Sequence, residues 1–534
     1  MSYATRFTLV FLFLALSAPL HSQQTDSARP GRSVDQLGTV RFANSCAPAV
    51  QEKLQQGVAM LHSFWYTEGE RTFREVLAAD PACAVANWGI AGVLMNNPLA
   101  GLGALPDSAQ RAIAAIERGR AAGAKTQREK DYIEAVAAYY ENFGERSERA
   151  RQEARAKAFE QLAARYPDDD EAQIFSALYL VALQSLEDKT YSFYLKAAGI
   201  LEKQFSKYPK HPGVAHYLIH SYDAPPIASK GLNAARRYAS IAPAAPHALH
   251  MPSHIFTRVG AWAESAATNR RSADAAVKAK DFHDALHAAD YMVYAYLQMG
   301  RDDDARTAVQ EFKTMTFDPG RFVAPYALAA MPARYAVERH DWRAAAQLES
   351  RVTKFPWVDA MTHFARALGA ARSGDAASAE HDLKKIAELR DALIAAKNKY
   401  WATEVEVNWL GAAAWTAFAR GKTDEALDLM RRAADLEDKN EKHIVTPARI
   451  LPARELLADM LLQLGKSADA LASYEASHQR EPERFRGLAG AADAAARSGN
   501  ALKAKQYYAR LIEIAGQGSS RPELSRARTF VAAN

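Results

Sequence analysis

The stretch "QLGKSADALASYEASHQREP" (residues 463–482) repeats its pattern in "RSGNALKAKQYYARLIEIAG" (residues 497–516). Gly465, Ala470 and Tyr474 of the first stretch correspond to Gly499, Ala504 and Tyr508 of the second, each 34 residues later. A glycine permits a tight turn between two antiparallel helices, and a small alanine shortly after it lets the second helix pack closely on the first. The two stretches therefore predict consecutive helical hairpins.

The same spacing of turn residue and small residue recurs upstream. It occurs at Gly300/Ala305, Gly374/Ala379 and Gly421/Ala426, and in variant form at Gly260/Ser265 and His340/Ala345, where Trp262 and Trp342 follow the turn. The period and these positions resemble the tetratricopeptide repeat superfamily. The resemblance implies an all-α protein, a right-handed α-solenoid of roughly ten helix hairpins. The composition, rich in Ala, Leu, Glu, Lys and Arg, also favours helix.

The first 22 residues are typical of a secretory signal peptide. Arg6 gives a positive start, residues 7–16 form a short apolar run, and the small Ser22 ends a cleavage site. No cysteine follows the run to carry a lipid anchor, and no later apolar run approaches the roughly 20 residues that cross a bilayer. We therefore expect a periplasmic or secreted bacterial protein without a membrane span.

These patterns divide the chain into six segments. They are a signal peptide (1–22), a flexible N-terminal segment (23–45), degenerate N-terminal hairpins (46–210), histidine-rich central hairpins (211–300), C-terminal hairpins (301–516) and a C-terminal tail (517–534).

Cysteine content and charge narrow the possible partners. Cys46 and Cys83 are the two cysteines, and an even pair in an oxidising compartment predicts one disulfide; the alternative is two buried thiols. The net charge of +5 is modest for 534 residues, and no block of Lys and Arg with interleaved aromatic residues occurs. We therefore expect no nucleic-acid partner.

Histidines are concentrated in the central segment. Eight of the 15 lie between His211 and His287. Residues three, four and seven apart share one face of a helix, which groups His216/His220/Asp223, His247/His250/His254 and His283/His287/Asp290. In tetratricopeptide proteins these positions lie on the first helix of each hairpin and face the concave groove. The resemblance therefore implies that the histidines converge there.

Three interpretations of the histidine cluster are open. As a metal site it would use imidazoles, which suit zinc, copper and iron alike; the candidate ligands are His216, His220, His247, His250, His254 and His287. As part of the core, the histidines would only pack and hydrogen-bond to backbone groups and to Tyr217, Tyr291 and Tyr294. As an anion site, the groove would bind its ligand through imidazoles and Arg258.

Three segments, "HPGVAHYLIHSYDAP", "APHALHMPSHIF" and "EKHIVTPARILPARELLADMLLQLG", resemble a group of exported bacterial tetratricopeptide proteins that lack an assigned activity. The third segment adds Glu441, Lys442 and His443 as candidate groove residues on a loop. The alternative for this loop is a solvated linker.

Two prolines interrupt expected first helices. Pro252 and Pro332 fall in the middle of these helices, where proline removes a hydrogen bond and bends the chain. Each bend would tilt a polar side chain, His254 or Arg334, into the groove. The alternative is a tolerated kink without functional consequence.

We expect a non-catalytic, exported protein whose groove binds a protein, peptide or small ligand, with a divalent metal as the candidate cofactor. The metalloprotease motif is absent, because Tyr217 and Met251 stand where it requires glutamate. The alternative is a metal-dependent enzyme, a hydrolase or oxidoreductase, that uses the same histidines as ligands. Asp223, Asp290 or Glu441 would then serve as a base.

Overall fold

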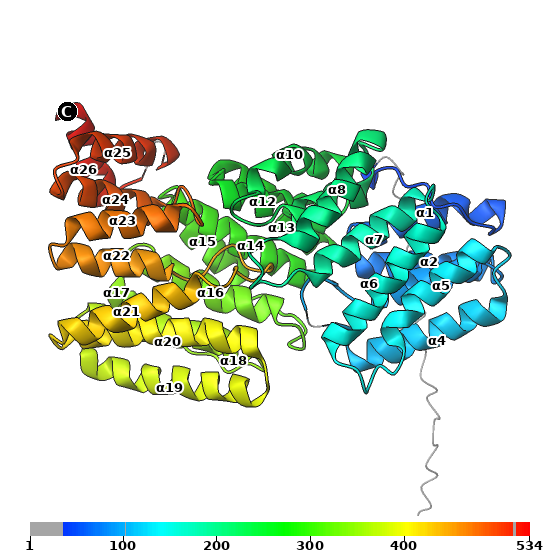
Figure 1. Cartoon of the computed structure of the whole chain (residues 1–534), viewed down its shortest axis with the longest axis horizontal. Coiled ribbons are helices and arrows are strands. Elements are labelled where there is room, and N and C mark those ends of the chain that lie inside the picture. Colours follow the sequence, from blue (N-terminus) through cyan, green and yellow to red (C-terminus); the bar gives the residue numbers. More distant parts are fainter. Residues whose placement is uncertain (1–35, 102, 516–518, 534) are drawn as a thin grey trace, which may run out of the picture. The chain divides into compact units, whose positions relative to one another are not determined.

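The computed structural model describes residues 36–101, 103–515 and 519–533, and all regular elements in these ranges are helical (Figure 1). The α-helices are α1 (Gln51–His62), α2 (Tyr66–Ala79), α3 (Ala84–Leu94), α4 (Pro106–Ala122), α5 (Gln127–Tyr140), α6 (Glu148–Arg165), α7 (Asp170–Leu183), α8 (Ser192–Lys207), α9 (Pro212–Ser221), α10 (Leu232–Ile241), α11 (Pro246–His250), α12 (Pro252–Val259), α13 (Trp262–Ala279), α14 (Phe282–Gln298), α15 (Asp302–Phe312), α16 (Val323–Val337), α17 (Trp342–Ala346), α18 (Pro356–Arg372), α19 (Ala376–Ala395), α20 (Lys399–Ala419), α21 (Thr423–Glu437), α22 (Ala453–Gln463), α23 (Ser467–His478), α24 (Phe485–Arg497), α25 (Ala501–Ala515) and α26 (Pro522–Ala533). Two short 3-10 helices are η2 (Pro48–Val50) and η3 (Ala228–Gly231).

Consecutive helices pair into hairpins, and each hairpin packs on the next. The first helices contact one another in succession, as α14, α16, α18, α20 and α22 do, and α11 with α12 takes the place of a single first helix between α9 and α14. Within the described residues α1 to α25 form twelve hairpins, against the roughly ten that the repeat pattern predicts. The fold is thus the all-α repeat scaffold expected from the sequence, with more hairpins than expected.

The interhelix turns have the geometry that the repeat pattern predicts. Gly465 and Gly499 have φ angles of 74° and 82°, a left-handed conformation that glycine adopts without steric cost. His340 occupies the same kind of turn with a φ of 58°. Ala470 and Ala504 are fully buried against the preceding helices. The glycine and alanine spacing therefore identifies these hairpin turns correctly.

The two prolines act differently. Pro252 begins α12 directly after α11 has ended at His250, so the expected bend is a break between two short helices. Pro332 lies inside α16, which continues past it to Val337. Only the first proline divides its helix.

Both ends of the described chain pack onto the scaffold. The predicted signal peptide, residues 1–22, lies outside the described residues. Leu37 and Phe42 are buried, and the Thr39 N–H donates to the Lys210 carbonyl at 2.9 Å, so residues 36–45 are packed where a flexible segment was expected. Cys46 and Cys83 form a disulfide. The expected C-terminal tail contains α26, which buries its apolar face.

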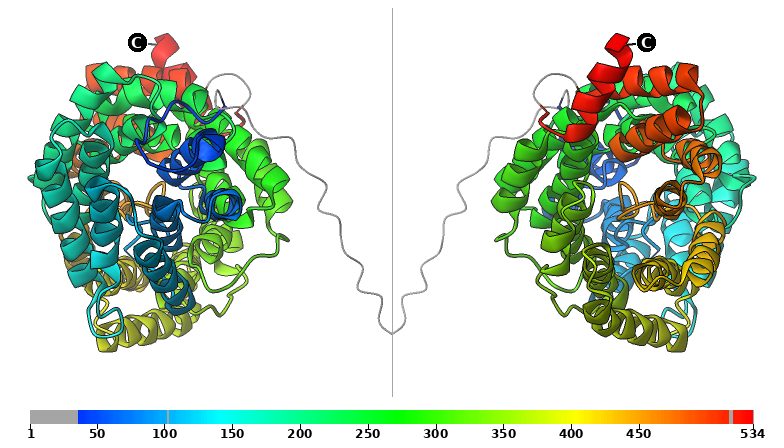
Figure 2. Two further views of the ribbon diagram at one scale, coloured as in Figure 1. Left: turned by 90° about the vertical axis from the view of Figure 1, so that its right-hand side faces the viewer. Right: turned by 90° about the vertical axis from the view of Figure 1, so that its left-hand side faces the viewer.

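The segment between α21 and α22, residues 438–452, lies inside the scaffold. Seen end-on, the helices of the described chain surround a common interior (Figure 2). Glu441 and Lys442 are buried there, and the Glu441 N–H donates to the Leu186 carbonyl at 2.8 Å. This contact ties the C-terminal hairpins to the N-terminal ones. The segment is therefore a buried plug and not the solvated linker that was one of the two expectations.

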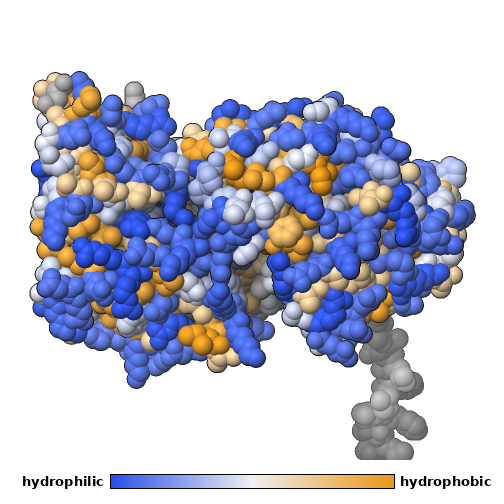
Figure 3. All heavy atoms as spheres, in the orientation of Figure 1, coloured by the Kyte–Doolittle hydropathy of each residue, from blue (hydrophilic) through white to orange (hydrophobic). Residues whose placement is uncertain are grey.

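The face shown in Figure 3 is predominantly hydrophilic, with small scattered apolar patches. None of the described helices combines the length and hydrophobicity of a bilayer-crossing segment.

Candidate functional site

Six histidines from three consecutive first-helix positions meet in the interior. Helix α9 supplies His216 and His220, α11 supplies His247 and His250, α12 supplies His254, and α14 supplies His287. None of the six side chains is more than 8% exposed. The histidine spacing along each helix places the rings on one face, and the stacking of the first helices brings the faces together. We call these six residues the histidine centre.

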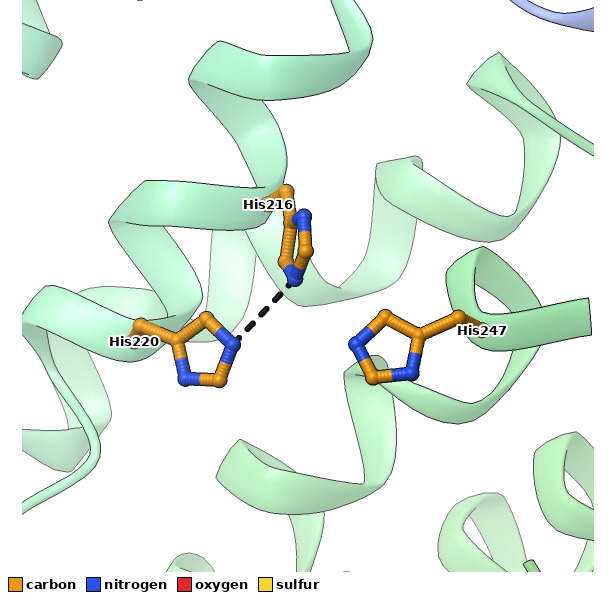
Figure 4. Close-up of side chains that lie close together, drawn as sticks. All are labelled: His216, His220 and His247. Carbon is orange, nitrogen blue, oxygen red and sulfur yellow. Dashed lines mark hydrogen bonds between the residues drawn. The ribbon is translucent and has the colours of Figure 1, made fainter. Parts of the chain in front are cut away.

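The histidine centre divides into two trios. In the first trio, ligand nitrogens of His216, His220 and His247 all lie within 4.8 Å of one another. Figure 4 shows their rings turned toward a common space, with His216 and His220 in hydrogen-bond contact and His247 opposite them. In the second trio, His250, His254 and His287 meet the same distance limit.

Oxygen acceptors outside the centre fix the proton positions on three rings. His216 Nδ1 lies 2.7 Å from the His62 carbonyl oxygen, and His254 Nδ1 lies 2.8 Å from Asp223 Oδ2. His250 Nδ1 lies 2.7 Å from Asn269 Oδ1. A carbonyl or carboxylate oxygen only accepts, so each Nδ1 carries the proton. In the neutral ring the opposite nitrogen, Nε2, is then a bare acceptor.

The orientation of Asn269 supports this assignment. Its Nδ2 donates to the Ser265 carbonyl at 2.8 Å, which leaves Oδ1 facing His250 as the acceptor. The amide is therefore held in place by the backbone of its own helix.

Two bare acceptors face each other in the second trio. His250 Nε2 and His254 Nε2 are 3.1 Å apart, and both rings already carry their proton on Nδ1. A neutral pair in this state has no hydrogen between the nitrogens, and an unsatisfied buried acceptor costs about 1–3 kcal/mol. An electron-accepting partner between the two nitrogens would relieve this contact.

Burial keeps the rings neutral. It lowers the pKa of His216, His220, His247, His250 and His287 well below the ordinary 6.5, and neighbouring imidazoles lower it further. At neutral pH the rings therefore do not readily take up an extra proton that could bridge the two facing nitrogens. Neutral imidazole is the form that binds metal ions.

The separations and the supporting hydrogen bonds fit a metal ion. Two nitrogens bound at about 2.0–2.1 Å in a tetrahedral site lie about 3.3 Å apart. The facing pairs in the two trios are separated by 3.2 and 3.1 Å. A metal-binding histidine characteristically donates its other N–H to a carboxylate or carbonyl oxygen, and His216, His250 and His254 do so.

Positively charged side chains surround Asp223, which lies beside the second trio. Arg258 Nε donates to Asp223 Oδ1 at 2.7 Å, and Lys442 Nζ lies 3.9 Å from the same oxygen. Burial alone would raise the pKa of Asp223, but Lys442 and Arg258 outweigh it and hold the carboxyl ionised. Burial lowers the pKa of Lys442 to about 7. Asp223 therefore stays an acceptor for His254.

The buried plug contributes backbone groups to the rim of the centre. Tyr291 Oη donates to the Thr446 carbonyl at 3.0 Å and lies 3.5 Å from His254 Nε2. Lys442 Nζ donates to the same carbonyl at 2.8 Å. Glu441 accepts from Lys189 at 2.7 Å. Of the three loop residues predicted at the groove, Glu441 and Lys442 lie beside the charged group around Asp223.

Other predicted groove residues do not line a ligand surface. His443 packs against Trp401, with ring centroids 4.9 Å apart. Arg334 pairs with Asp290 and donates to the Ala448 carbonyl. Tyr294 accepts from the fully buried Arg484. Arg334 and Tyr294 are thus partnered by buried groups of the scaffold and the plug, and His443 is itself part of the plug. The expected open groove is closed here.

A second buried histidine cluster was not predicted from the sequence. Glu171 accepts from His62 Nε2 at 2.9 Å and from His211 Nε2 at 3.0 Å. His62 Nδ1 contacts Tyr217 Oη at 2.9 Å, and His211 Nδ1 accepts the Val214 N–H at 3.3 Å. We call this cluster the Glu171 network. Its members lie on separate hairpins, so no local spacing connects His62 or Glu171 with His211.

Comparison with known proteins identifies no family. No family model and no curated protein matches the sequence. Among solved structures, the human IFIT1 dimer with m7Gppp-AAAA aligns with a TM-score of 0.35 and 12% identity over 81% of this chain and 90% of that chain. The human IFIT1 dimer with PPP-AAAA gives a TM-score of 0.37 and 12% identity over 81% and 91%. Similarity at this level assigns neither a family nor a ligand to this chain.

Proposed function

We propose that the chain is an exported tetratricopeptide-like scaffold that binds transition-metal ions at the histidine centre. The carrying observation is the contact between His250 Nε2 and His254 Nε2 at 3.1 Å, both without a proton. An ion between them converts an unfavourable contact of two acceptors into two coordinate bonds. The full burial of the rings favours a bare ion over an organic ligand.

The type of ligand atom narrows the choice of metal ion. Imidazole nitrogen suits zinc, copper and iron, whereas calcium and magnesium prefer oxygen ligands. Thiolate ligands are excluded, because Cys46 and Cys83 are joined in the disulfide. Zinc, copper and iron remain as candidates.

A metal-dependent enzyme is a second candidate for one specific reason. Each trio offers three protein ligands, and a catalytic zinc site characteristically has three protein ligands and an open fourth position. The described surroundings favour binding without turnover, because the plug closes the centre from the concave side. Binding of a protein or peptide partner in the groove stays a prediction.

Metal content tests the proposal directly. The full mature chain, purified without a histidine tag, is dialysed against excess zinc or copper and then against buffer, and its metal is measured by mass spectrometry. We expect stoichiometric retention, reduced by His250→Gln combined with His254→Gln and unchanged by His381→Gln on the exposed face of α19. A wild-type chain that takes up no zinc, copper or iron in a titration sinks the proposal.

A further inference from the structure

We infer that the histidine centre holds two metal ions side by side, one in each trio. This inference rests on the proposed function and specifies its stoichiometry and arrangement. Three observations support two ions: the grouping of the ligand nitrogens, the spacing between the two trios, and the separate hydrogen-bond partners that orient the rings of each trio.

The grouping excludes a single ion with six histidine ligands. Ligand nitrogens bound to one ion at about 2.1 Å lie at most about 4.2 Å apart, on opposite sides of it. Each trio satisfies a limit of 4.8 Å, but the six residues fall into two such groups and not into one. A single ion therefore cannot bind all six histidines.

The two trios are nevertheless direct neighbours. The His220 and His254 ring centroids are 5.5 Å apart, and those of His247 and His250 are 5.9 Å apart. Within the trios, His216 and His247 are 5.1 Å apart, as are His250 and His254. Ring spacings between the trios thus resemble those inside them. Ions in the two trios would therefore occupy neighbouring sites.

Each trio is oriented by its own hydrogen-bond partners. His216 in the first trio is fixed by the His62 carbonyl, whereas His250 and His254 in the second are fixed by Asn269 and Asp223. In the first trio, His247 Nε2 is buried and has no hydrogen-bond partner, so this nitrogen is free to bind an ion. Both trios are therefore prepared for a ligand independently.

Stoichiometry and spectroscopy together test for two ions. We expect about two equivalents of zinc or copper per wild-type chain. His216→Gln with His247→Gln removes donors of the first trio, and His250→Gln with His254→Gln removes donors of the second; each pair is expected to leave one equivalent. His381→Gln is the control, and far-ultraviolet circular dichroism checks that each variant is folded.

Copper distinguishes adjacent ions from distant ones. Two neighbouring Cu(II) ions couple magnetically, so the wild-type paramagnetic resonance signal should be broadened or fall well below two spins, while each folded variant should give the sharp signal of one isolated ion. One equivalent in the wild type, or two uncoupled spins, overturns the inference and leaves metal binding intact. Loss of all metal in both variants also overturns it, since the trios would then share one ion. No metal in the wild type removes the proposed function as well.

Discussion

Two buried histidine clusters in the described part of the chain, the Glu171 network and the histidine centre, differ in how completely their ring nitrogens are hydrogen-bonded. In the Glu171 network all four ring nitrogens of His62 and His211 have a partner, and a carboxylate lies between the rings. In the histidine centre the rings face one another with no anion between them, and the carboxylate of Asp223 stands behind His254. Both clusters are buried, although the Glu171 network has two histidines and the histidine centre has six. Completeness of hydrogen bonding is what separates a structural cluster from a site that needs a ligand.

The position of the carboxylate also sets the charge of each cluster. Burial alone would raise the pKa of Glu171, but His211 and His62 outweigh it and the pKa falls well below its usual value. Burial lowers the pKa of the rings of the histidine centre, as it lowers that of His62, but the centre has no anion among its rings. The Glu171 network therefore contains an ionised carboxylate, whereas the histidine centre consists of neutral imidazoles.

Acid should produce the largest difference between the clusters. The six rings of the centre have folded pKa values below the unfolded value of 6.5, so below pH 6.5 the unfolded chain binds more protons and stability falls as the pH falls. Between pH 6.5 and 5.5 a ring that stays neutral in the folded chain contributes up to about 1 kcal/mol, so we expect a total fall of several kcal/mol. Denaturant unfolding of metal-free protein at pH 7.5, 6.5 and 5.5 measures it.

Above about pH 7.5 the same rings are neutral in both states and add no further pH dependence. His381→Gln removes an exposed histidine and should leave the profile unchanged. A metal-free protein whose unfolding free energy is constant down to pH 5.5 would show that the rings are not neutral and buried in solution.

Removal of Glu171 should give the next largest effect. Glu171→Ala leaves His62 and His211 facing a void without their shared acceptor, and breaking a buried pair typically costs about 3–5 kcal/mol. Metal uptake by the folded fraction should not change, because the Glu171 network is already complete. Urea unfolding and metal content are measured on the same samples. Glu117→Ala, on an exposed side chain, is the control, and metal loss in Glu171→Ala would make the two clusters one functional unit.

Metal should stabilise the histidine centre and leave the Glu171 network unaffected. At a free metal concentration one hundred times Kd, one bound ion adds about 2.7 kcal/mol to the unfolding free energy. We expect an increment of at least this size, and about twice it when both trios are occupied, in the wild type and in Glu171→Gln. His250→Gln with His254→Gln should show a reduced increment. Thermal unfolding with added zinc and with a chelator provides the comparison, and equal increments in all three proteins would contradict it.

The sequence predicts the scaffold and the histidine centre because both depend on short spacings. Gly465 and Ala470 define a hairpin turn within one repeat, and His216 with His220 share a face because they are four residues apart. Stacking of equivalent helices then brings His254 and His287 to the same place. Spacings of this kind lie within a single repeat, so they are visible in a short stretch of sequence.

The sequence does not predict the closure of the centre or the Glu171 network. Lys442 and Glu441 belong to a segment between two hairpins, and nothing in the repeat period indicates that it folds inward and contacts Leu186. His62 and Glu171 are 109 residues apart, so their contact follows only from the curvature of the assembled scaffold. Asp290 and Arg334, predicted to face a ligand, pair with each other instead, and both side chains are buried.

The smallest predicted effect concerns a residue outside both trios. Asn269 Oδ1 accepts a hydrogen bond from the Nδ1–H group of His250. This bond keeps the proton on Nδ1 and leaves Nε2 of the same ring free to bind metal. Asn269→Ala should weaken metal affinity about tenfold, at the lower end of what a lost supporting hydrogen bond costs. Asn269→Asp keeps an acceptor at the same position and should retain the wild-type affinity. Competition with a chromogenic chelator measures both values. Equal weakening in the two variants would mean that Asn269 fills space, and that the proton position on His250 does not distinguish this centre from the Glu171 network.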